Sequence, residues 1–585
     1  MSRGSRLADW LEERASARSA LRWALDEPVP GGARAAYVFG SALLALALVQ
    51  LVTGLGLALY YTPSEAGAWS SVFWIQTQVT LGWLLRGLHH HGASAAVVVA
   101  ALHLGQALSF GAYRRPRELT WMLGVLLLLL LLAFALTGYL LPWDQRGYWA
   151  TRVATSMVGT APAVGGSLER LAQGGEVYGT LTLTRFYALH AIALPLLFLG
   201  VVLLHVALFR RHGVTPPPGV GVAQRAGAPL RTDRFWPRQA SLDALASAAA
   251  VLVVLLLAVK GHGAPLEAPA DPSRAPLPRP EWYFLALFQL QKIFQGRLEP
   301  VGTFFLPGLA VAALFLLPFL DRARGRGFHE RRAVLALAGL GAVALLGLTA
   351  AALLADARDP RIAAARQESE SAAARAKELA AHGIPPEGPA FMVANDPPER
   401  GRRAFASECA GCHAPGVAGE RKAPDLAGLF SLDWVREQIR DPDQPNRFGA
   451  TKLKGKMDAF GRRLSPERID ALARFVHARR DPVRVDSPPD PALDEGRRAF
   501  ARVGCAECHA LVRGEAKDGP NLYDYGSDRY LRALVEDPGS PLFFGKHNGM
   551  PAMRGRLAPG ELDAVLVYLK MLQAEPVYGR GRPGS

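Results

Sequence analysis

Cysteine is scarce in this sequence: the 585 residues contain only four, at positions 409, 412, 505 and 508. All four belong to two Cys-x-x-Cys-His motifs, so none is left for a disulfide or for a thiolate-ligated iron–sulfur cluster. Acidic residues are also outnumbered by basic ones, 51 against 66. The basic residues flank apolar runs, so we interpret the net charge of +15 as a signal of membrane topology and not of nucleic-acid binding.

The first 36 residues lack a continuous apolar core and carry scattered Arg and Glu, which argues against a signal peptide. The apolar residues Leu7, Trp10, Leu11, Leu21 and Trp23 predict that residues 1–36 form an amphipathic segment on the membrane surface. A mobile tail is the alternative.

Long apolar runs are abundant elsewhere, and seven of them are long enough to cross a hydrocarbon core of about 30 Å. They lie near residues 37–61, 81–110, 120–141, 186–209, 241–259, 301–320 and 333–355. Arg clusters precede the first run and follow the second, fourth and sixth, whereas residues 62–82 contain no Lys or Arg. The sequence therefore predicts an all-α protein of the cell (inner) membrane: a multi-pass, seven-helix transmembrane bundle with a cytoplasmic N-terminus and residues 356–585 outside.

The soluble end contains an internal repeat. Gly401-Arg-Arg-Ala-Phe405 precedes Cys409-Ala-Gly-Cys412-His413, and Gly496-Arg-Arg-Ala-Phe500 precedes Cys505-Ala-Glu-Cys508-His509. After a helical and then proline-broken linker at 356–398, we predict two small helical domains, at 399–484 and 485–585.

Each Cys-x-x-Cys-His motif predicts a covalently attached c-type haem whose iron is ligated by the motif histidine, His413 or His509. Its occurrence in both copies argues against a chance match or a zinc site. Met457 and Met550 are the predicted distal ligands, since both precede a leucine at the same spacing, and Met553 is the competitor in the second copy. The region resembles the class I cytochrome c family.

Four histidines lie within the apolar runs. His89 and His103 are fourteen residues apart, and His190 and His205 are fifteen apart. Fourteen residues rise roughly 21 Å along a helix and return to nearly the same face. We therefore predict two non-covalent b-type haems, one ligated by His89 and His190 on the outer side, the other by His103 and His205 on the inner side.

Glycines repeat with the same period in the two neighbouring runs, at Gly40 and Gly54 and at Gly124 and Gly138. A missing side chain lets a macrocycle edge approach the backbone, so these glycines are predicted to border the haems. Generic packing of small residues between helices is the alternative.

Several motifs give this pattern a family likeness. These motifs are the segments 86–94, 138–145 and 184–190 and the sequence Pro280-Glu281-Trp282-Tyr283-Phe284. They resemble cytochrome b of bc-type complexes in its chloroplast form. The three-helix subunit, which is a separate chain in that form, is fused in this chain. The resemblance implies a four-helix di-haem core at 37–210, a three-helix region with the outer quinol-site loop at 211–355, and Arg86 as a haem-binding residue. Val38 stands where the chloroplast form has a Cys, so no extra covalent haem is expected.

The resemblance also implies a mechanism, in which quinol gives one electron to a separate Rieske iron–sulfur protein and the other to the b haems, coupled to proton translocation. The residues it places at the outer quinol site are Pro280, Glu281, Trp282, Tyr283, Trp143 and Asp144. Glu281 is the expected proton acceptor, with a structural loop charge as the alternative. The implied partners are the quinone pool, a downstream cytochrome c or terminal oxidase, membrane lipid and a second copy of the complex. A non-bifurcating membrane electron wire and a tether for cytochromes are the other functions considered.

Overall fold

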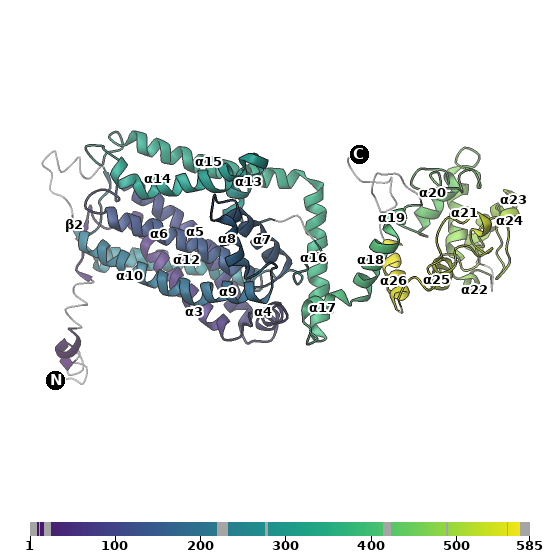
Figure 1. Ribbon diagram of the computed structural model, residues 1–585, viewed down its shortest axis with the longest axis horizontal. Helices are drawn as coiled ribbons and strands as arrows, with labels where there is room; N and C mark the ends of the chain where they lie inside the picture. Colours follow the sequence, from purple (N-terminus) through teal and green to yellow (C-terminus); the bar gives the residue numbers. More distant parts are fainter. Residues whose placement is uncertain are drawn as a thin grey trace. The chain divides into compact units, whose positions relative to one another are not determined.

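The computed structural model describes residues 9–10, 12–16, 25–218, 232–274, 279–413, 423–486, 490–558 and 560–573. Helices dominate these residues, as the sequence predicts (Figure 1). The chain divides into two compact units, Met1–Met392 and Val393–Ser585. Of the residues that define the N-terminal amphipathic prediction, Leu7, Leu11, Leu21 and Trp23 lie outside the described residues.

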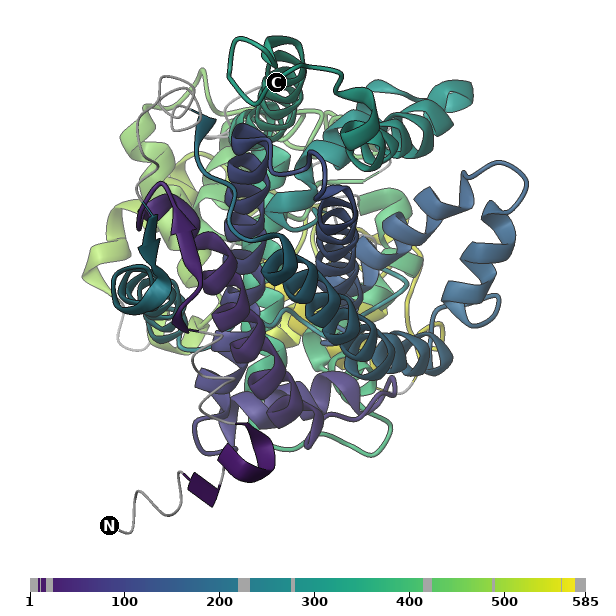
Figure 2. The same cartoon turned by 90° about the vertical axis from the view of Figure 1, so that its left-hand side faces the viewer.

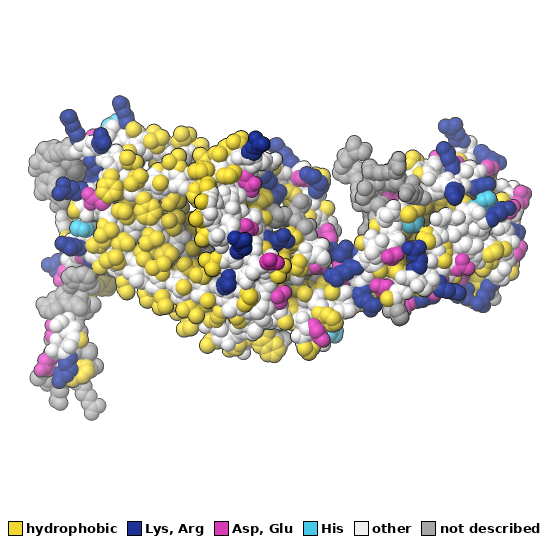
Figure 3. Space-filling view, in the orientation of Figure 1, with side chains coloured by type: hydrophobic (Ala, Val, Ile, Leu, Met, Phe, Trp, Pro, Cys, Tyr) yellow, Lys and Arg dark blue, Asp and Glu magenta, His cyan; other side chains and the backbone are white. Residues whose placement is uncertain are grey.

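Seven helical segments among the described residues are long and apolar enough to cross a membrane, which matches the seven predicted runs. Leucines on them, among them Leu48, Leu196 and Leu337, are exposed, as lipid-facing side chains must be. Hydrophobic side chains cover much of the visible face of the bundle (Figure 3). Figure 2 shows the ribbon turned by 90°, with the left-hand side of Figure 1 facing the viewer. The segments are α3 (Phe39–Ala58), α5 (Gly82–Phe110), α6 (Glu118–Leu140), α9–η2–α10 (Thr180–His212), η3–α12 (Phe235–Lys260), η5–η6–α14 (Gly296–Leu320) and α15 (Arg332–Arg358).

Short helices lie at one end of the bundle, which we call the outer end after the predicted topology. They are α4 (Ala68–Thr77), α7 (Gln145–Gly159), α8 (Gly165–Gln173) and α13 (Leu285–Ile293). At the other end, strand β1 (Pro28–Pro30) pairs antiparallel with β2 (Thr232–Arg234).

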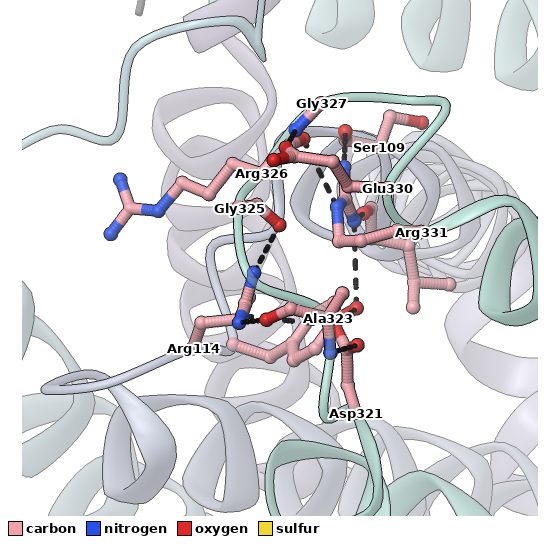
Figure 4. A network of polar contacts seen from close by, with 11 residues as sticks. Ser109, Arg114, Asp321, Ala323, Gly325, Arg326, Gly327, Glu330 and Arg331 are labelled. Carbon is pink, nitrogen blue, oxygen red and sulfur yellow. Dashed lines mark hydrogen bonds and ion pairs between the residues drawn. The ribbon is translucent and has the colours of Figure 1, made fainter.

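A polar network fastens α14 and α15 to the four-helix part at the inner end (Figure 4). Arg331, 1% exposed, donates hydrogen bonds to the carbonyls of Leu108 (2.7 Å) and Ser109 (2.6 Å) in the last turn of α5. Arg114 lies 3.8 Å from the carboxylate of Asp321. The carbonyls that a helix C-terminus leaves without an intrahelical partner are thus satisfied by an arginine that is more than 200 residues away in sequence.

The segment predicted as a linker contains a long helix, α16 (Pro360–Ala381), followed by α17 (Pro389–Ala394). Its alanines Ala373, Ala376 and Ala380 are buried, and Glu368 forms an ion pair with Arg274 of the loop after α12. Helix α16 is therefore packed against the outer end of the bundle.

The second unit contains each helix of the repeat twice. The first copy has α18 (Pro397–Glu408), α20 (Leu432–Arg440) and α21 (Pro466–Ala478), and the second has α23 (Asp494–Arg502), α25 (Asp528–Glu536) and α26 (Glu561–Gln573). The Cys-x-x-Cys turns form α19 (Ala410–His413) and α24 (Cys505–Cys508), and α22 (Pro482–Asp486) follows the first copy.

The main helix pairs cross from one copy to the other: α18 packs against α26, and α21 packs against α23. Both crossings are close at a glycine. A Cβ atom on Gly401 would lie 1.9 Å from the carbonyl oxygen of Ala564, and one on Gly496 would lie 2.2 Å from that of Ala471. The boundary between residues 484 and 485 stays a sequence prediction, but the copies share one core.

Candidate functional site

The outer pair of membrane histidines is brought together by α5 and by the π-helical turn η2, which directly precedes α10. The ring centroids of His89 and His190 are 6.2 Å apart, and the rings are inclined by 73°. An imidazole–metal bond is about 2 Å long, so this separation leaves room for one metal atom between the two rings.

Threonine hydroxyls hold both rings. His89 Nδ1 lies 3.0 Å from Thr53 Oγ1, and His190 Nδ1 lies 3.0 Å from Thr137 Oγ1. Each hydroxyl also donates its hydrogen to a backbone carbonyl, Thr53 to Val49 at 2.6 Å and Thr137 to Ala133 at 2.8 Å. The threonine oxygen must therefore accept from Nδ1–H, which leaves Nε2 of each histidine free to bind iron. These two threonines were not predicted from the sequence, although the dipeptide Thr-Gly occurs at both places.

A π-helical turn, η2 (Leu189–Ala193), contains His190. A π-bulge adds one residue to a helical turn, so the fifteen-residue step from His190 to His205 spans about the same number of turns as the fourteen-residue step from His89 to His103. Both histidines of this helix can then project from one face.

Each of the four predicted glycines faces one of the four predicted histidines. A Cβ atom placed on the glycine would approach the ring atom Cε1 in every case, at 3.0 Å for Gly54 and His89, 2.6 Å for Gly138 and His190, 3.3 Å for Gly124 and His205, and 3.8 Å for Gly40 and His103. A large ring bound to these histidines needs this free space beside the backbone.

The two inner histidines differ in the hydrogen bonding of their Nδ1 atoms. His205 Nδ1 donates to the carbonyl of Thr120 at 3.0 Å, which again leaves Nε2 free. His103 Nδ1 is buried without a hydrogen-bond partner among the described residues. The neighbouring His91 has its Nε2 atom 3.8 Å from the position that a Cβ on Gly261, just after the end of α12, would take.

The two motif histidines of the second unit are held in the same way as each other. His413 Nδ1 donates to the carbonyl of Pro424 and His509 Nδ1 to that of Pro520, both at 2.8 Å. Because a carbonyl only accepts, Nε2 is again the nitrogen left for a metal. One helical turn separates the two thiols in each motif, Cys409 from Cys412 and Cys505 from Cys508.

Backbone hydrogen bonds show which methionine of the second copy corresponds to Met457. Phe460 N–H donates to Ile439 in the first copy, and Met553 N–H donates to Val535 in the second. Met553 therefore occupies the place of Phe460, and it is 3% exposed within the core. This leaves Met550 as the counterpart of Met457.

Trp143 and Asp144 are buried at the start of α7. Asp144 caps the helix by accepting from Gly147 N–H at 2.9 Å, and its other oxygen accepts from Glu267 N–H at 3.1 Å. Trp143 N–H donates to Leu140, and its carbonyl accepts from Ala270. These two residues fix the loop at residues 264–270 against the outer end of the bundle.

The segment Pro280–Phe284 lies next to this loop. Trp282, Tyr283 and Phe284 form a single 3-10 turn with contacting rings, and the Glu281 carboxylate lies 4.0 Å from a guanidinium nitrogen of Arg146. Burial raises the pKa of Glu281 above its usual value, while the charge of Arg146 opposes that rise. A carboxyl with a raised pKa suits a group that takes up and releases protons.

Arg86 is buried near the start of α5 and faces the same loop. It donates to the carbonyls of Ala264 and Pro265, both at 2.6 Å, and to the side chain of Gln76. These hydrogen bonds tie Arg86 to the loop that also carries Glu267 and to Gln76 of α4.

Three family models match the chain. Cytochrome b/b6/petB matches residues 24–213, and Cytochrome b(C-terminal)/b6/petD matches residues 269–366. Cytochrome C oxidase, cbb3-type, subunit III matches twice, over residues 396–476 and 491–569, once for each copy of the repeat.

Individual proteins agree with these models. Cytochrome b6 of Synechococcus sp. (strain JA-3-3Ab) is 40% identical over 213 residues, which cover 36% of this chain and 99% of that protein. Cytochrome b6 of Chlamydomonas reinhardtii is 39% identical over the same length and with the same coverage. A solved chain of a hyperthermophilic respiratory Complex III superposes with a TM-score of 0.51 and 28% identity, over 59% of this chain and 91% of that one.

Proposed function

The chain belongs to the cytochrome b/b6 family, a multi-pass, haem-binding component of bc-type electron-transfer complexes, and from that premise we propose that it is the cytochrome b/c subunit of a quinol:cytochrome c oxidoreductase. In this proposal it oxidises membrane quinol at the outer end of the bundle. The b haems would carry one electron of each quinol inward to a quinone at the inner face, and the c haems would carry the other electron out.

Five of the six proposed histidine ligands have Nε2 left free because Nδ1 is hydrogen-bonded, and the sixth, His103, has no hydrogen-bond partner at Nδ1 among the described residues. His89 with His190 and His103 with His205 would hold two b haems, and the glycine facing each histidine leaves space for the ring. In the second unit, the four cysteines would bind two c haems covalently, with His413 and Met457 and with His509 and Met550 as axial ligands. When bound, these groups supply reversible one-electron transfer.

One observation supports quinol chemistry most directly: consecutive residues of α6 reach both the outer histidine pair and the outer loop. Gly138 faces His190, while the side chain of Tyr139 lies within electrostatic range of Glu281 and Arg146. A substrate between this loop and the outer pair would have a proton acceptor on one side and an electron acceptor on the other.

In the proposed reaction, Glu281 takes a proton from bound quinol and releases it at the outer face. Quinol must lose protons as it loses electrons, because a buried charge is costly in a low-dielectric pocket. Tyr283, Trp282 and Pro280 would form the wall of the pocket, and Trp143 and Asp144 would position the loop behind it.

The first electron needs an acceptor that this chain does not supply through its cysteines, because all four belong to the haem-attachment motifs. We therefore propose a separate Rieske iron–sulfur protein as partner, a downstream cytochrome c or terminal oxidase as final acceptor, and a homodimeric assembly in the cell membrane. The two c domains would lie on the outer side.

Purification of the native complex, with subunit identification and a redox titration, tests the proposal. We expect a Rieske protein to copurify and quinol to reduce the b and c haems in a reaction that inhibitors of the outer site block. A complex with b and c haems but no Rieske protein would instead support the alternative, a non-bifurcating quinone-linked electron carrier.

A further inference from the structure

Arg146 occupies an electrostatically unfavourable position. It is the second residue of α7, where the positive end of the helix dipole disfavours a cation. Its guanidinium is compensated by two carboxylates: Nη2 lies 2.7 Å from Glu267 Oε1, and Nη1 lies 4.0 Å from Glu281 Oε1. Both acidic residues come from a different part of the chain. The tertiary fold therefore supplies the negative charges that offset the unfavourable position of Arg146.

Glu267 is presented by a fixed backbone. Its N–H donates to Asp144 at 3.1 Å, and its carbonyl accepts from the indole of Trp69 at 2.8 Å. The side chains of Glu267 and Glu281 are 18% and 16% exposed, while that of Arg146 is 41% exposed. Arg146 therefore reaches from the aqueous side to the half-buried Glu281 and is anchored on the way by Glu267.

We infer that Arg146 is a positioning residue of the outer quinol site: its guanidinium, anchored on Glu267, supplies the counter-charge that governs when Glu281 can accept a proton. The inference rests on the proposed function, since it gives Arg146 a role only if Glu281 receives the quinol proton. It adds two residues, Arg146 and Glu267, to a site whose sequence motif contains neither.

The sign of the effect follows from the groups around Glu281. Arg146 and Asp144 face it from the start of α7, and Tyr139 faces it from the end of α6. Tyr283 adjoins it in its own turn. Because Arg146 is the cation in this set, its removal raises the pKa of Glu281, and the loss of proton-accepting activity on acidification then begins at a higher pH.

Glu267 acts in the opposite direction. Arg146 is closer to Glu267 than to Glu281, so neutralising Glu267 releases the guanidinium to approach Glu281. Glu267→Gln should then lower the pKa of Glu281, whereas Arg146→Met should raise it. General damage to the loop would not produce opposite shifts.

The test uses the purified complex with Arg146→Met, Glu267→Gln and the control Arg152→Met. Arg152 lies on the same helix, stacked 4.7 Å from the ring centroid of Trp149, and is not one of the charges that act on the Glu281 carboxyl. Two quantities are measured against pH: the rate of quinol oxidation, and the infrared band of the protonated carboxyl that Glu281→Gln abolishes.

Arg146→Met should shift both curves toward higher pH by about one unit, a shift typical of losing one opposite charge at this distance near solvent. Glu267→Gln should move both down, and Arg152→Met should leave both in place. Unmoved curves in Arg146→Met, or shifts of equal sign in the two test variants, would overturn the inference. A wild-type complex that fails to oxidise quinol would instead contradict the proposed function, while the infrared titration would still report on Arg146.

Discussion

The two units hold their candidate iron ligands by different means. In the membrane unit, His89 and His190 are about a hundred residues apart, come from different helices and are oriented by threonine hydroxyls. In the second unit, His413 and His509 directly follow the cysteines that would bind the haem and are oriented by proline carbonyls eleven residues later.

This difference predicts how each kind of haem site responds to a substitution. A non-covalent haem depends on two helices being packed at the right distance, so one substitution in either helix removes its binding. A covalent haem is retained by its thioether bonds, so a substitution nearby changes its potential or the stability of the fold instead. Five predictions test this contrast.

The largest effect is expected from His190→Ala. Loss of one ligand should remove the outer b haem and abolish quinol oxidation, while both c haems remain. The c-to-b ratio in a pyridine haemochrome assay should rise from about one to about two, as expected for bis-histidine sites that each need both ligands. An unchanged ratio would show that His190 is not a ligand. A third covalent haem in the wild type would contradict the prediction that Val38 excludes an extra covalent haem.

Next is Glu281→Gln, which keeps the side-chain shape but removes the base. We expect normal b and c spectra with quinol oxidation slowed roughly 10²-fold, the lower range for loss of a general base. Stopped-flow measurements of haem reduction by quinol check this. Wild-type turnover across the pH range would mean that Glu281 is a structural charge.

Substitution of the glycines separates haem clearance from generic helix packing. The Cβ of Gly138→Ala would lie 2.6 Å from His190, whereas that of Gly40→Ala would lie 3.8 Å from His103, an ordinary contact. Gly138→Ala should therefore lower the amount or shift the spectrum of the outer b haem, and Gly40→Ala should leave the inner one nearly unchanged. Equal behaviour of the two variants would favour the packing explanation.

A smaller effect is expected at the helix crossing of the second unit. Gly401→Ala places a Cβ against the carbonyl of Ala564, and overpacking of this kind costs about 1–3 kcal/mol. Because the crossing joins the two copies, the midpoint of thermal unfolding should fall for both c haems together. Circular dichroism in the Soret region measures this midpoint. A lower midpoint for the first c domain alone would argue against helix pairs that join the two copies.

The smallest structural change is expected at the distal ligands. Met550→His should lower the potential of one c haem without loss of haem, since imidazole favours ferric iron more than a thioether does, and Met457→His should do so for the other. Met553→Leu, a change within the core, should leave both potentials in place. A redox titration in which a Met553 variant shifts a potential and Met550→His does not would reverse this assignment.

Much of the molecule could be predicted from local sequence. The seven spans follow from runs of apolar residues, and the two Cys-x-x-Cys-His motifs with their repeated flanks follow from residues a few positions apart. The family likeness, confirmed by the cytochrome b6 relatives and by the C-terminal family model that matches residues 269–366, adds the outer segment 280–284. The histidine pairs, by contrast, remain predictions about ligation that the described geometry supports.

What the sequence alone determined, then, is short-ranged: hydropathy places each helix, and adjacent residues specify the covalent haem motif. Tertiary structure decided what depends on partners far apart in the chain. The π-helical turn at His190 absorbs the extra residue of a fifteen-residue spacing, and α18 packs on α26 and not on a helix of its own copy. Arg146 meets Glu267 only because the start of α7 lies against the loop after α12. Hydropathy and spacing report on neighbours in sequence, whereas such contacts form only once the helices are packed.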